Sequence, residues 1–346
     1  MTNVAVVGAA GYAGIEAVRL VLAHDRLQLT LATSAADQGK LISDVYPALA
    51  GLTDLAFSLP DPGVIAAAAD VALLAVPHTA ALELVPPLLE RGVRVIDMSA
   101  DYRLQDAELY EAWYAAPHTS PELLAEAVFG LPELDRSRLL GARLVACPGC
   151  YPTATTLASL PALAAGVVTG DRIVVDAKSG VSGAGRSATA TTHYVTVNEA
   201  IAPYKVAAHR HTPEIEQALS SAAGRQLAVV FAPHLVPMSR GLLSTVYMEV
   251  EPGFSAADAH ELYCAHYADE PFVFVRPLGA MPSTAEVRGT NRASIGVAVD
   301  THTNTLIAAC AIDNLVKGAA GQAVQCLNAV LGYPEAEGLN RPAPIV

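Results

Sequence analysis

The sequence predicts an α/β protein, with an N-terminal Rossmann domain built on a doubly wound parallel sheet and a second α+β domain built on a mixed sheet. Buried apolar runs alternate with helical patterns in the first half, and this alternation changes near residues 147–151. The chain has 346 residues, too many for one ordinary core and a fit for two domains. Hydrophobic residue types make up 52%, enough to build large cores.

The first half alternates strand and helix. Residues 4–7 form an all-apolar run that is typical of a strand buried on both faces. A glycine-rich turn at 8–14 follows, and Ile15, Val18 and Leu22 then recur at helical spacing. Further strands are expected at 27–32, 71–76, 93–96 and 144–146, with a helix at 80–91. Such alternation implies right-handed βαβ units and a parallel sheet.

The second half predicts strands separated by loops and bounded by Gly or Pro, which fits a mixed or antiparallel sheet. They are expected at 173–177, 227–231, 244–250, 272–275 and 294–299. Asp313 is a candidate N-cap for a final helix that runs to Leu331 and is closed by Gly332. The pattern change places the first domain at 1–148.

Composition excludes several classes of function. Lys and Arg total 21 and Asp and Glu total 34, a net charge of −13, which argues against nucleic acid and anionic membrane partners. The apolar runs are too short to span a bilayer, and the start of the chain lacks the basic stretch of a signal peptide. Five sparse cysteines indicate a reducing compartment. We therefore expect a soluble cytoplasmic enzyme.

The turn GAAGYAG at 8–14 is a GxxGxxG pattern between the first strand and the first helix. Gly8, Gly11 and Gly14 would let the backbone approach a pyrophosphate, which the helix N-terminus then stabilises. The alternative is a glycine-rich turn without a ligand. Its position directly after an N-terminal buried strand favours a dinucleotide site.

The end of the second strand bears on the choice of cofactor. NAD sites place an acidic residue there, but residues 32–36 read ATSAA and no acid occurs before Asp37. Hydroxyl groups such as that of Ser34 suit a 2′-phosphate, so NADP is favoured over NAD. The nearest cation is Lys40, and an ordinary Ser-Thr turn is the alternative.

The segment CPGCYPT at 147–153 is the most informative stretch. A helix is expected to begin just after Cys150, and a helix N-terminus stabilises a thiolate and an adjoining oxyanion. A cysteine in this position after a dinucleotide domain suggests covalent aldehyde or acyl chemistry. The alternatives are an inert buried cysteine and a redox pair with Cys147. Zinc is disfavoured because no further ligand pair follows, so no metal is expected.

Acid/base candidates lie in the segment HRHTPE at 209–214. His209 and His211 would point to the same side of an extended chain, and Thr212 is expected to cap a helix that starts at Pro213. Glu214 would then reach back to one histidine and fix its tautomer. A solvated loop is the alternative, and the pattern does not choose between the two histidines.

Two scarce cations lie in predicted loops. Arg103 ends the loop 97–103, which follows a strand, and Arg240 lies in the loop 237–241. Arginines in such loops form bidentate clamps on carboxylate or phosphate, although surface ion pairs are the alternative. The stretch 179–186, SGVSGAGR, is too rich in glycine for a strand or a helix and is expected to be a functional loop.

These motifs together resemble those of the N-acetyl-gamma-glutamyl-phosphate reductases, relatives of aspartate-semialdehyde dehydrogenase. The matching stretches lie at 8–16, 97–103, 147–153, 179–186, 209–214, 287–291 and 311–325. The resemblance covers nearly the whole chain. It implies domains at 1–148 (NADP-binding), 149–312 (catalytic and dimerisation) and 313–346, the last a helix that returns to the first domain. It also implies a homodimer or homotetramer.

The resemblance also assigns roles to residues. Cys150 falls on the family's nucleophile, and the base falls on the His209/His211 pair, with His209 preferred and Glu214 as the orienting acid. Arg103, Arg240 and Ser182 fall on substrate-binding positions. The implied NADP contacts are Gly8, Gly11, Tyr12, Ala13, Gly14, Ser34, Ser182, Gly183 and Asn314. One departure is Cys147, where the family often has Asn, and it raises the hypothesis of a Cys147–Cys150 disulfide.

The implied reaction is the NADPH-dependent reductive dephosphorylation of N-acetyl-gamma-glutamyl phosphate through a Cys150 thioester, a step of arginine biosynthesis that releases inorganic phosphate. The nearest alternative is an aspartate-semialdehyde dehydrogenase with a shorter substrate. A non-catalytic NADP-binding sensor, and then a CxxC redox protein, are more distant alternatives. Neither accounts for a cysteine accompanied by two histidines.

Overall fold

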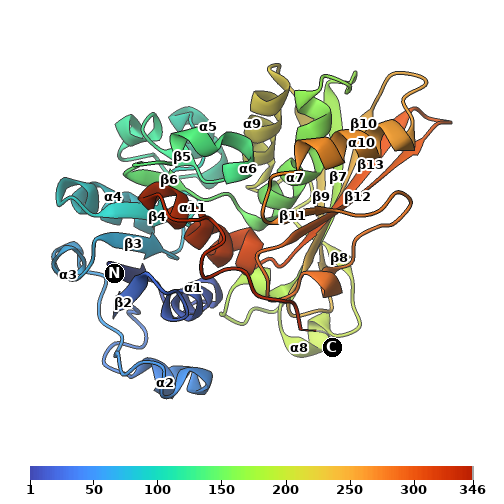
Figure 1. The fold of residues 1–346 in the computed structure, drawn as a ribbon. Coiled ribbons are helices and arrows are strands. Elements are labelled where there is room, and N and C mark those ends of the chain that lie inside the picture. The colour runs from blue at the N-terminus through green and yellow to red at the C-terminus, as the bar shows by residue number, and fades with distance from the viewer. Residues whose placement is uncertain (345–346) are drawn as a thin grey trace. The chain divides into compact units, whose positions relative to one another are not determined.

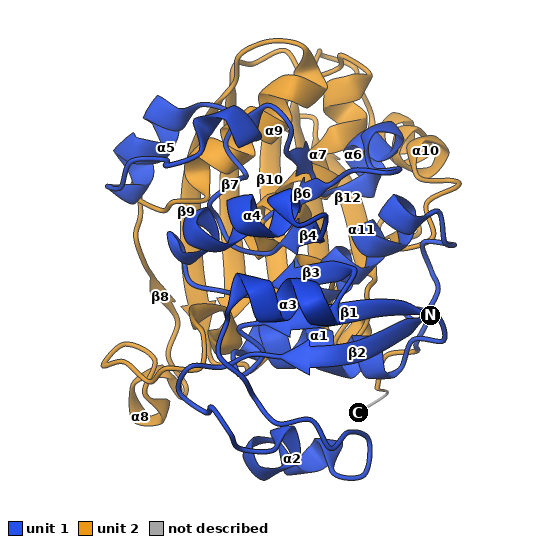
Figure 2. Cartoon of the chain, turned by 90° about the vertical axis from the view of Figure 1, so that its left-hand side faces the viewer, with its two compact units in different colours: residues 1–148, 319–341 blue, residues 149–318, 342–346 orange. Residues whose placement is uncertain are grey.

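The computed structural model describes residues 1–344 (Figure 1). It divides into two compact units, coloured separately in Figure 2. The first unit contains Met1–Pro148 and Ala319–Arg341, and the second contains Gly149–Gly318 together with the described residues after 341. The chain therefore leaves the first unit at the CPGC segment and re-enters it after Gly318.

The first unit is built on a parallel sheet of six strands in the order β2-β1-β3-β4-β6-β5. The strands are β1 (Thr2–Val7), β2 (Leu27–Ala32), β3 (Val71–Leu74), β4 (Arg94–Asp97), β5 (Val128–Phe129) and β6 (Leu144–Ala146). The predicted Rossmann class is confirmed, and only the two-residue β5 was not expected. Because all six strands are parallel, the loops after β1, β3, β4 and β6 share one edge of the sheet.

Helices cover this sheet. They are α1 (Tyr12–Leu22), α2 (Ile42–Val45), α3 (Pro62–Ala68), α4 (Ala80–Glu90), α5 (Ala107–Tyr114), α6 (Pro132–Asp135) and α11 (Gly321–Leu331), with short 3₁₀ turns η1 (Pro47–Leu49), η2 (Pro121–Leu124) and η3 (Arg136–Arg138). Alternate strand residues such as Ala5, Val7 and Leu74 form a buried cluster with Val85 and Leu88 of α4. The C-terminal helix α11 packs on α1 and β4, so a distant part of the chain completes this unit.

The second unit is built on a mixed sheet of seven strands in the order β11-β12-β13-β10-β7-β9-β8. The pairs β7/β9 and β11/β12 are parallel and the others antiparallel. The strands are β7 (Arg172–Gly180), β8 (Ala202–Pro203), β9 (Ala228–Val236), β10 (Leu242–Glu249), β11 (Val273–Val275), β12 (Ala293–Asp300) and β13 (Thr305–Ile312). This confirms the predicted mixed sheet. Strand β13, absent from the prediction, pairs with both β10 and β12.

The helical elements of the second unit are α7 (Cys150–Ala164), α8 (Tyr194–Val197), α9 (Thr212–Ala223), α10 (Ala256–His266), η4 (Val181–Ala184) and η5 (Thr284–Glu286). The turn η6 (Val316–Ala320) begins in the second unit, and its last two residues belong to the first. Helix α7 packs on β10, β13, α9 and α10, and residues 151–163 are buried throughout. Its small and apolar side chains explain this, since they allow close contact on every side of the helix.

Two local predictions need correction. Residues 179–186 were expected to be neither strand nor helix, but β7 continues to Gly180 because the Gly180 N–H bonds Gly241 O at 2.8 Å, and η4 follows. The final helix was expected to run unbroken from its cap at Asp313. Asp313 does accept N–H bonds from Leu315 and Val316, but the first turn is the π-helical η6, and α11 begins only at Gly321. Gly332, at φ +69°, ends that helix as expected.

Candidate active site

The glycine turn after β1 is closed by two glycines. Gly8 has φ +81°, and a Cβ there would lie 2.5 Å from the carbonyl oxygen of Ala75. A Cβ on Gly14 would lie 2.3 Å from Gly8 O. No side chain fits at either position without moving backbone, so both glycines are required by the turn itself.

Gly11 differs, because the protein alone does not require a glycine there. It is the N-cap of α1 with φ −74° and ψ 163°, a conformation open to any residue, and a Cβ would meet only Gly8 O at 3.5 Å. Helix α1 has no side-chain cap and no acidic residue in its first turn, and Tyr12 beside the cap is 36% exposed. A missing side chain beside uncapped N–H groups fits the pyrophosphate of a dinucleotide.

At the end of β2, the Thr33 hydroxyl accepts a hydrogen bond from Gly8 N at 3.1 Å, which ties this segment to the glycine turn. Ser34 is buried, and its Oγ accepts from Asp37 N at 3.2 Å and lies 3.4 Å from the Asp37 carboxylate. Lys40 Nζ donates to the other Asp37 oxygen at 2.9 Å. Asp37, the acid that follows Ser34 by three residues, is thus in contact with the Ser34 side chain, and Lys40 forms an ion pair with it.

Cys150 is the first residue of α7, is half-buried and is not part of a disulfide. The N-cap Gly149 has no side chain, and its N–H donates to Glu214 Oε1 at 2.8 Å. Glu214 is 1% exposed and comes from the first turn of α9. A charge-assisted hydrogen bond therefore fixes the backbone next to the thiol. Glu214 was predicted to hold a histidine, and the hydrogen bond to Gly149 is a contact the sequence did not suggest.

The turn η6 approaches the same thiol. A Cβ on Gly318 would lie 2.6 Å from Cys150 Cβ, and Gly318 N–H bonds Asp313 O at 3.0 Å. The side of Cys150 that faces η6 is therefore filled by backbone, which restricts the thiol's rotamers.

His209 is 9% exposed among aromatic rings. Its ring centroid lies 5.6 Å from that of Tyr151, 5.4 Å from Tyr204 and 5.3 Å from Phe231. Burial, and then the nearby charges of Lys205 and Arg210, lower the pKa of His209 to about 4. The imidazole is therefore neutral at neutral pH.

The tautomer of His209 follows from its neighbour. His209 Nδ1 accepts the backbone N–H of His211 at 3.1 Å, so the neutral ring carries its proton on Nε2. The half-buried His211 is the N-cap of α9, and the two ring centroids are 4.7 Å apart. Cys150, Glu214 and both histidines are thus gathered at the paired starts of α7 and α9.

The two candidate arginines have different surroundings. Arg103, in the first unit, is 8% exposed, and its guanidinium donates to the carbonyl oxygens of Cys147 and Met98, each at 2.8 Å. It thereby holds the chain just before the CPGC turn. Arg240, in the second unit, has a 30% exposed side chain whose Nη1 lies 3.6 Å from Asp313 Oδ2. Arg240 is therefore the better placed of the two to meet a ligand.

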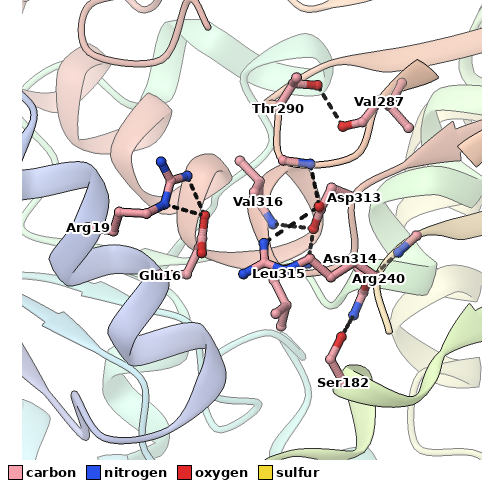
Figure 3. A network of polar contacts seen from close by, with 12 residues as sticks. Glu16, Arg19, Ser182, Arg240, Val287, Thr290, Asp313, Asn314, Leu315 and Val316 are labelled. Carbon is pink, nitrogen blue, oxygen red and sulfur yellow. Dashed lines mark hydrogen bonds and ion pairs between the residues drawn. The ribbon is translucent and has the colours of Figure 1, made fainter. Parts of the chain in front are cut away.

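Ser182, Gly183 and Asn314 lie together, as Figure 3 shows for Ser182 and Asn314. Asn314 is 2% exposed; its Nδ2 donates to Ser182 Oγ at 2.9 Å and its Oδ1 accepts from Gly241 N at 2.8 Å. Gly183 is exposed beside them. The predicted cofactor and substrate residues of this unit therefore form one network with the Arg240 loop.

Cys147 is fully buried, and no disulfide links any of the five cysteines, all of which lie within residues 1–344. A hydrogen bond with Cys326 of α11, followed by burial, raises the pKa of Cys147 well above its ordinary value. Cys326 also lies 3.2 Å from Gly130 O. The neighbour recorded for Cys147 is thus Cys326, and the Cys147–Cys150 disulfide remains a hypothesis. Among residues 1–344, no group of three His, Cys, Asp or Glu side chains is placed to hold a metal.

Sequence reasoning did not assign a role at the site to three aromatic residues or to Asp313. Tyr151, Tyr204 and Phe231 surround His209, and the Tyr204 hydroxyl donates to that of Tyr151 at 3.2 Å. Tyr151 and Tyr204 flank the CPGC and HRHTPE motifs, so proximity in sequence was an available signal. Phe231 and Asp313 reach the site only through the fold.

Family models define the class. The model described as the semialdehyde dehydrogenase NAD binding domain matches residues 3–142, and the semialdehyde dehydrogenase dimerisation domain matches 150–314. The fold agrees: an aspartate semialdehyde dehydrogenase II from Vibrio cholerae has a TM-score of 0.73 at 18% identity, covering 95% of this chain and 98% of that one. A Candida albicans aspartate semialdehyde dehydrogenase crystallised with NADP has a TM-score of 0.70 at 15% identity, covering 95% and 98%.

Curated relatives give the particular family. Proteins named N-acetyl-gamma-glutamyl-phosphate reductase from Pelobacter propionicus and Geotalea daltonii are 49% and 50% identical, each over 98% of both chains. One from Symbiobacterium thermophilum is 47% identical over 99% of both. The chain belongs to the N-acetyl-gamma-glutamyl-phosphate reductase family, whose members are oxidoreductases with an NAD(P)-binding domain. No helix within residues 1–344 is long and apolar enough to cross a bilayer.

Proposed function

We propose that this chain reduces N-acetyl-gamma-glutamyl phosphate to N-acetyl-glutamate semialdehyde with NADPH, through a thioester on Cys150, as a step of arginine biosynthesis. The observation that carries the proposal is Cys150 at the first position of α7, with the preceding N–H fixed by buried Glu214. The names of relatives that share about half of the sequence over its full length supply the substrate.

In the first half-reaction, the sulfur of Cys150 attacks the γ-carbonyl carbon and the C–O bond to phosphate breaks. The thiol proton ends on the leaving inorganic phosphate, so the products are a thioester and hydrogen phosphate. Backbone N–H groups at the start of α7 stabilise the tetrahedral oxyanion, with about 3 kcal/mol for each well-placed donor.

The second half-reaction needs a hydride at the thioester carbon, which NADPH would supply when bound. The tetrahedral oxyanion that results collapses to the aldehyde, and the C–S bond breaks to return the Cys150 thiolate, which takes up a proton from solvent to regenerate the thiol of the first half-reaction. His209, neutral and protonated on Nε2, is suited to donate a hydrogen bond to this oxyanion. His211 is the second candidate for the acid/base role.

The residues of the first unit fit the dinucleotide. Gly8 and Gly14 close the turn, Gly11 leaves room for the pyrophosphate, and Tyr12 and Ala13 begin the helix that faces it. We assign NADP rather than NAD, with the Ser34 hydroxyl and the Lys40 ammonium as partners of the 2′-phosphate. The Asp37 carboxylate beside Ser34 opposes this, and its pairing with Lys40 offsets that effect.

The assay is run in the phosphate-dependent oxidative direction, with N-acetyl-glutamate semialdehyde, phosphate and either NADP or NAD. The proposal expects turnover, at least tenfold higher kcat/KM with NADP, and a marked fall in that ratio for Lys40→Ala. Aspartate semialdehyde is the control substrate. Faster turnover of aspartate semialdehyde would overturn the substrate assignment, and a preference for NAD would overturn the cofactor assignment.

We also propose that the chain forms a homodimer, or a homotetramer made of two such dimers, through the second unit. Its sheet exposes Val174 on β7 at 39% and Val230 on β9 at 51%, and the matched family model is described as a dimerisation domain. Exposed apolar side chains on neighbouring strands mark an interface. Val230→Glu should lower the molar mass measured by light scattering, whereas a monomeric wild type would contradict the proposal.

A further inference from the structure

Asp313 is the centre of a polar network in the second unit (Figure 3). It is fully buried. Its Oδ1 accepts from Leu315 N at 2.8 Å and Val316 N at 3.1 Å, and its Oδ2 accepts from Gly289 N at 2.7 Å. Three backbone donors from two separate segments hold the carboxylate, so its position is fixed.

This fixed anion is paired with Arg240. Arg240 Nη1 lies 3.6 Å from Asp313 Oδ2, an ion-pair distance longer than a hydrogen bond. The Asp313 side chain has no exposed surface, whereas that of Arg240 is 30% exposed. One guanidinium nitrogen therefore faces a buried carboxylate while part of the same side chain reaches solvent.

The adjacent residue holds the backbone of the same loop. Asn314 Oδ1 accepts from Gly241 N, directly after Arg240, at 2.8 Å, and Asn314 Nδ2 donates to Ser182 Oγ at 2.9 Å. The dipeptide Asp313–Asn314 thus constrains Arg240 through its guanidinium and through the next peptide. A flexible arginine has many rotamers, and two such constraints select among them.

We propose that Asp313 is a positioning residue that orients the Arg240 guanidinium toward an anionic group, the carboxylate or phosphate of the substrate. This rests on the proposed function, which supplies an acyl phosphate ligand. Asp313 itself is buried away from solvent and acts through Arg240. The guanidinium is planar, and its fork of N–H groups matches the geometry of a carboxylate or a phosphate.

Asp313 also shapes the chain near Cys150. It caps the turn η6, and its carbonyl accepts from Gly318 N, the residue packed on Cys150. A purely structural role would therefore disturb the nucleophile and lower kcat, whereas a positioning role through Arg240 raises KM for the anion.

The test is a double-mutant cycle of Asp313→Asn, Arg240→Ala and the pair, with KM for inorganic phosphate and for the semialdehyde in the oxidative direction. Each single change should raise KM for one of these anions about tenfold, with a smaller change in kcat. The double variant should have the KM of Arg240→Ala alone, because the two residues act as a unit. The proposal would be overturned if the fold-change in KM of the double variant were the product of the two single fold-changes. It would also be overturned if Asp313→Asn changed kcat alone.

Controls separate this outcome from the proposed function. Asp269→Asn removes an exposed carboxylate of the same unit and should keep the wild-type KM. If Asp313→Asn does not fold, Asp313→Glu keeps the charge but displaces it, and a wild-type KM in that variant would contradict positioning. If the wild type shows no turnover, the proposed function fails. Stabilisation in thermal melts by inorganic phosphate or by the semialdehyde, lost in both single variants and kept in Asp269→Asn, would still support the role of Asp313. Equal stabilisation of all the proteins by each of the two ligands would refute it.

Discussion

Two helices in this chain start in almost the same way and serve different chemistry. Gly11 caps α1 at φ −74° and ψ 163°, and Gly149 caps α7 at φ −67° and ψ 164°. Neither cap has a side chain to satisfy the first N–H groups, and neither first turn carries an acid. Both helix starts therefore favour a nearby negative charge, and neither helix supplies one from its own first turn.

The difference lies in what surrounds each start. At α1, the residue after the cap is exposed and Gly11 has room beside it, which suits a ligand that arrives and leaves. At α7, Glu214 accepts a hydrogen bond from the cap N–H and Gly318 packs against Cys150, while residues 151–163 of the helix are buried. On the proposed function, the same arrangement of backbone would bind a cofactor at the open start of α1 and hold the nucleophile at the constrained start of α7.

The contact between Gly318 and Cys150 at the start of α7 is tested most strongly by Gly318→Ala. The new methyl would lie 2.6 Å from Cys150 Cβ, so the thiol must shift. A displacement of about 1 Å costs roughly 100-fold in rate, so kcat should fall by that order while the Kd for NADPH is unchanged. Unchanged kcat in steady-state assays would show that the contact does not position the thiol. Gly332→Ala, at a helix C-cap elsewhere, controls for general destabilisation.

The proposed role of the α1 N-terminus in binding NADPH is tested by comparing Gly11→Ala with Gly14→Ala. The methyl at 11 meets only Gly8 O at 3.5 Å, so the fold should tolerate it while the Kd for NADPH rises about tenfold or more. The methyl at 14 would lie 2.3 Å from Gly8 O, so thermal stability should fall too, by about 1–3 kcal/mol. Titration with NADPH and thermal melts separate the two effects. Unchanged NADPH binding by Gly11→Ala would contradict the proposal that the pyrophosphate binds at this turn.

A smaller effect, on the pH dependence of stability, tests whether the His209 side chain beside α7 is desolvated. The pKa of His209 is about 4 in the folded protein and 6.5 in a model peptide. The unfolded chain therefore binds this proton first, so its contribution to stability is full above pH 6.5 and is lost as pH falls toward 4. His209→Gln should lose less stability than wild type between pH 7 and pH 4.5 in urea unfolding. An equal loss in both proteins would mean that His209 is not desolvated.

The sequence carries more information about fold than about side-chain geometry. Alternating apolar runs predicted the first sheet, because each buried parallel strand is a local pattern. Strand β13 escaped the sequence prediction, although it pairs with both β10 and β12. The motifs also named Cys150, Arg240 and Glu214 as candidate site residues, but they did not predict the partners of Arg240 and Glu214. Glu214 meets Gly149 and Arg240 meets Asp313 across 65 and 73 positions, and no local pattern encodes such distant pairs.

The central claim is that Cys150 carries the acyl group, and intact mass spectrometry of the protein mixed with acyl phosphate in the absence of cofactor tests it directly. The account predicts a mass increase of one N-acetylglutamyl acyl group per chain, retained in Cys147→Ser and absent in Cys150→Ser, which should still bind NADPH. An adduct that persists in Cys150→Ser, or appreciable turnover by that variant, would contradict the account.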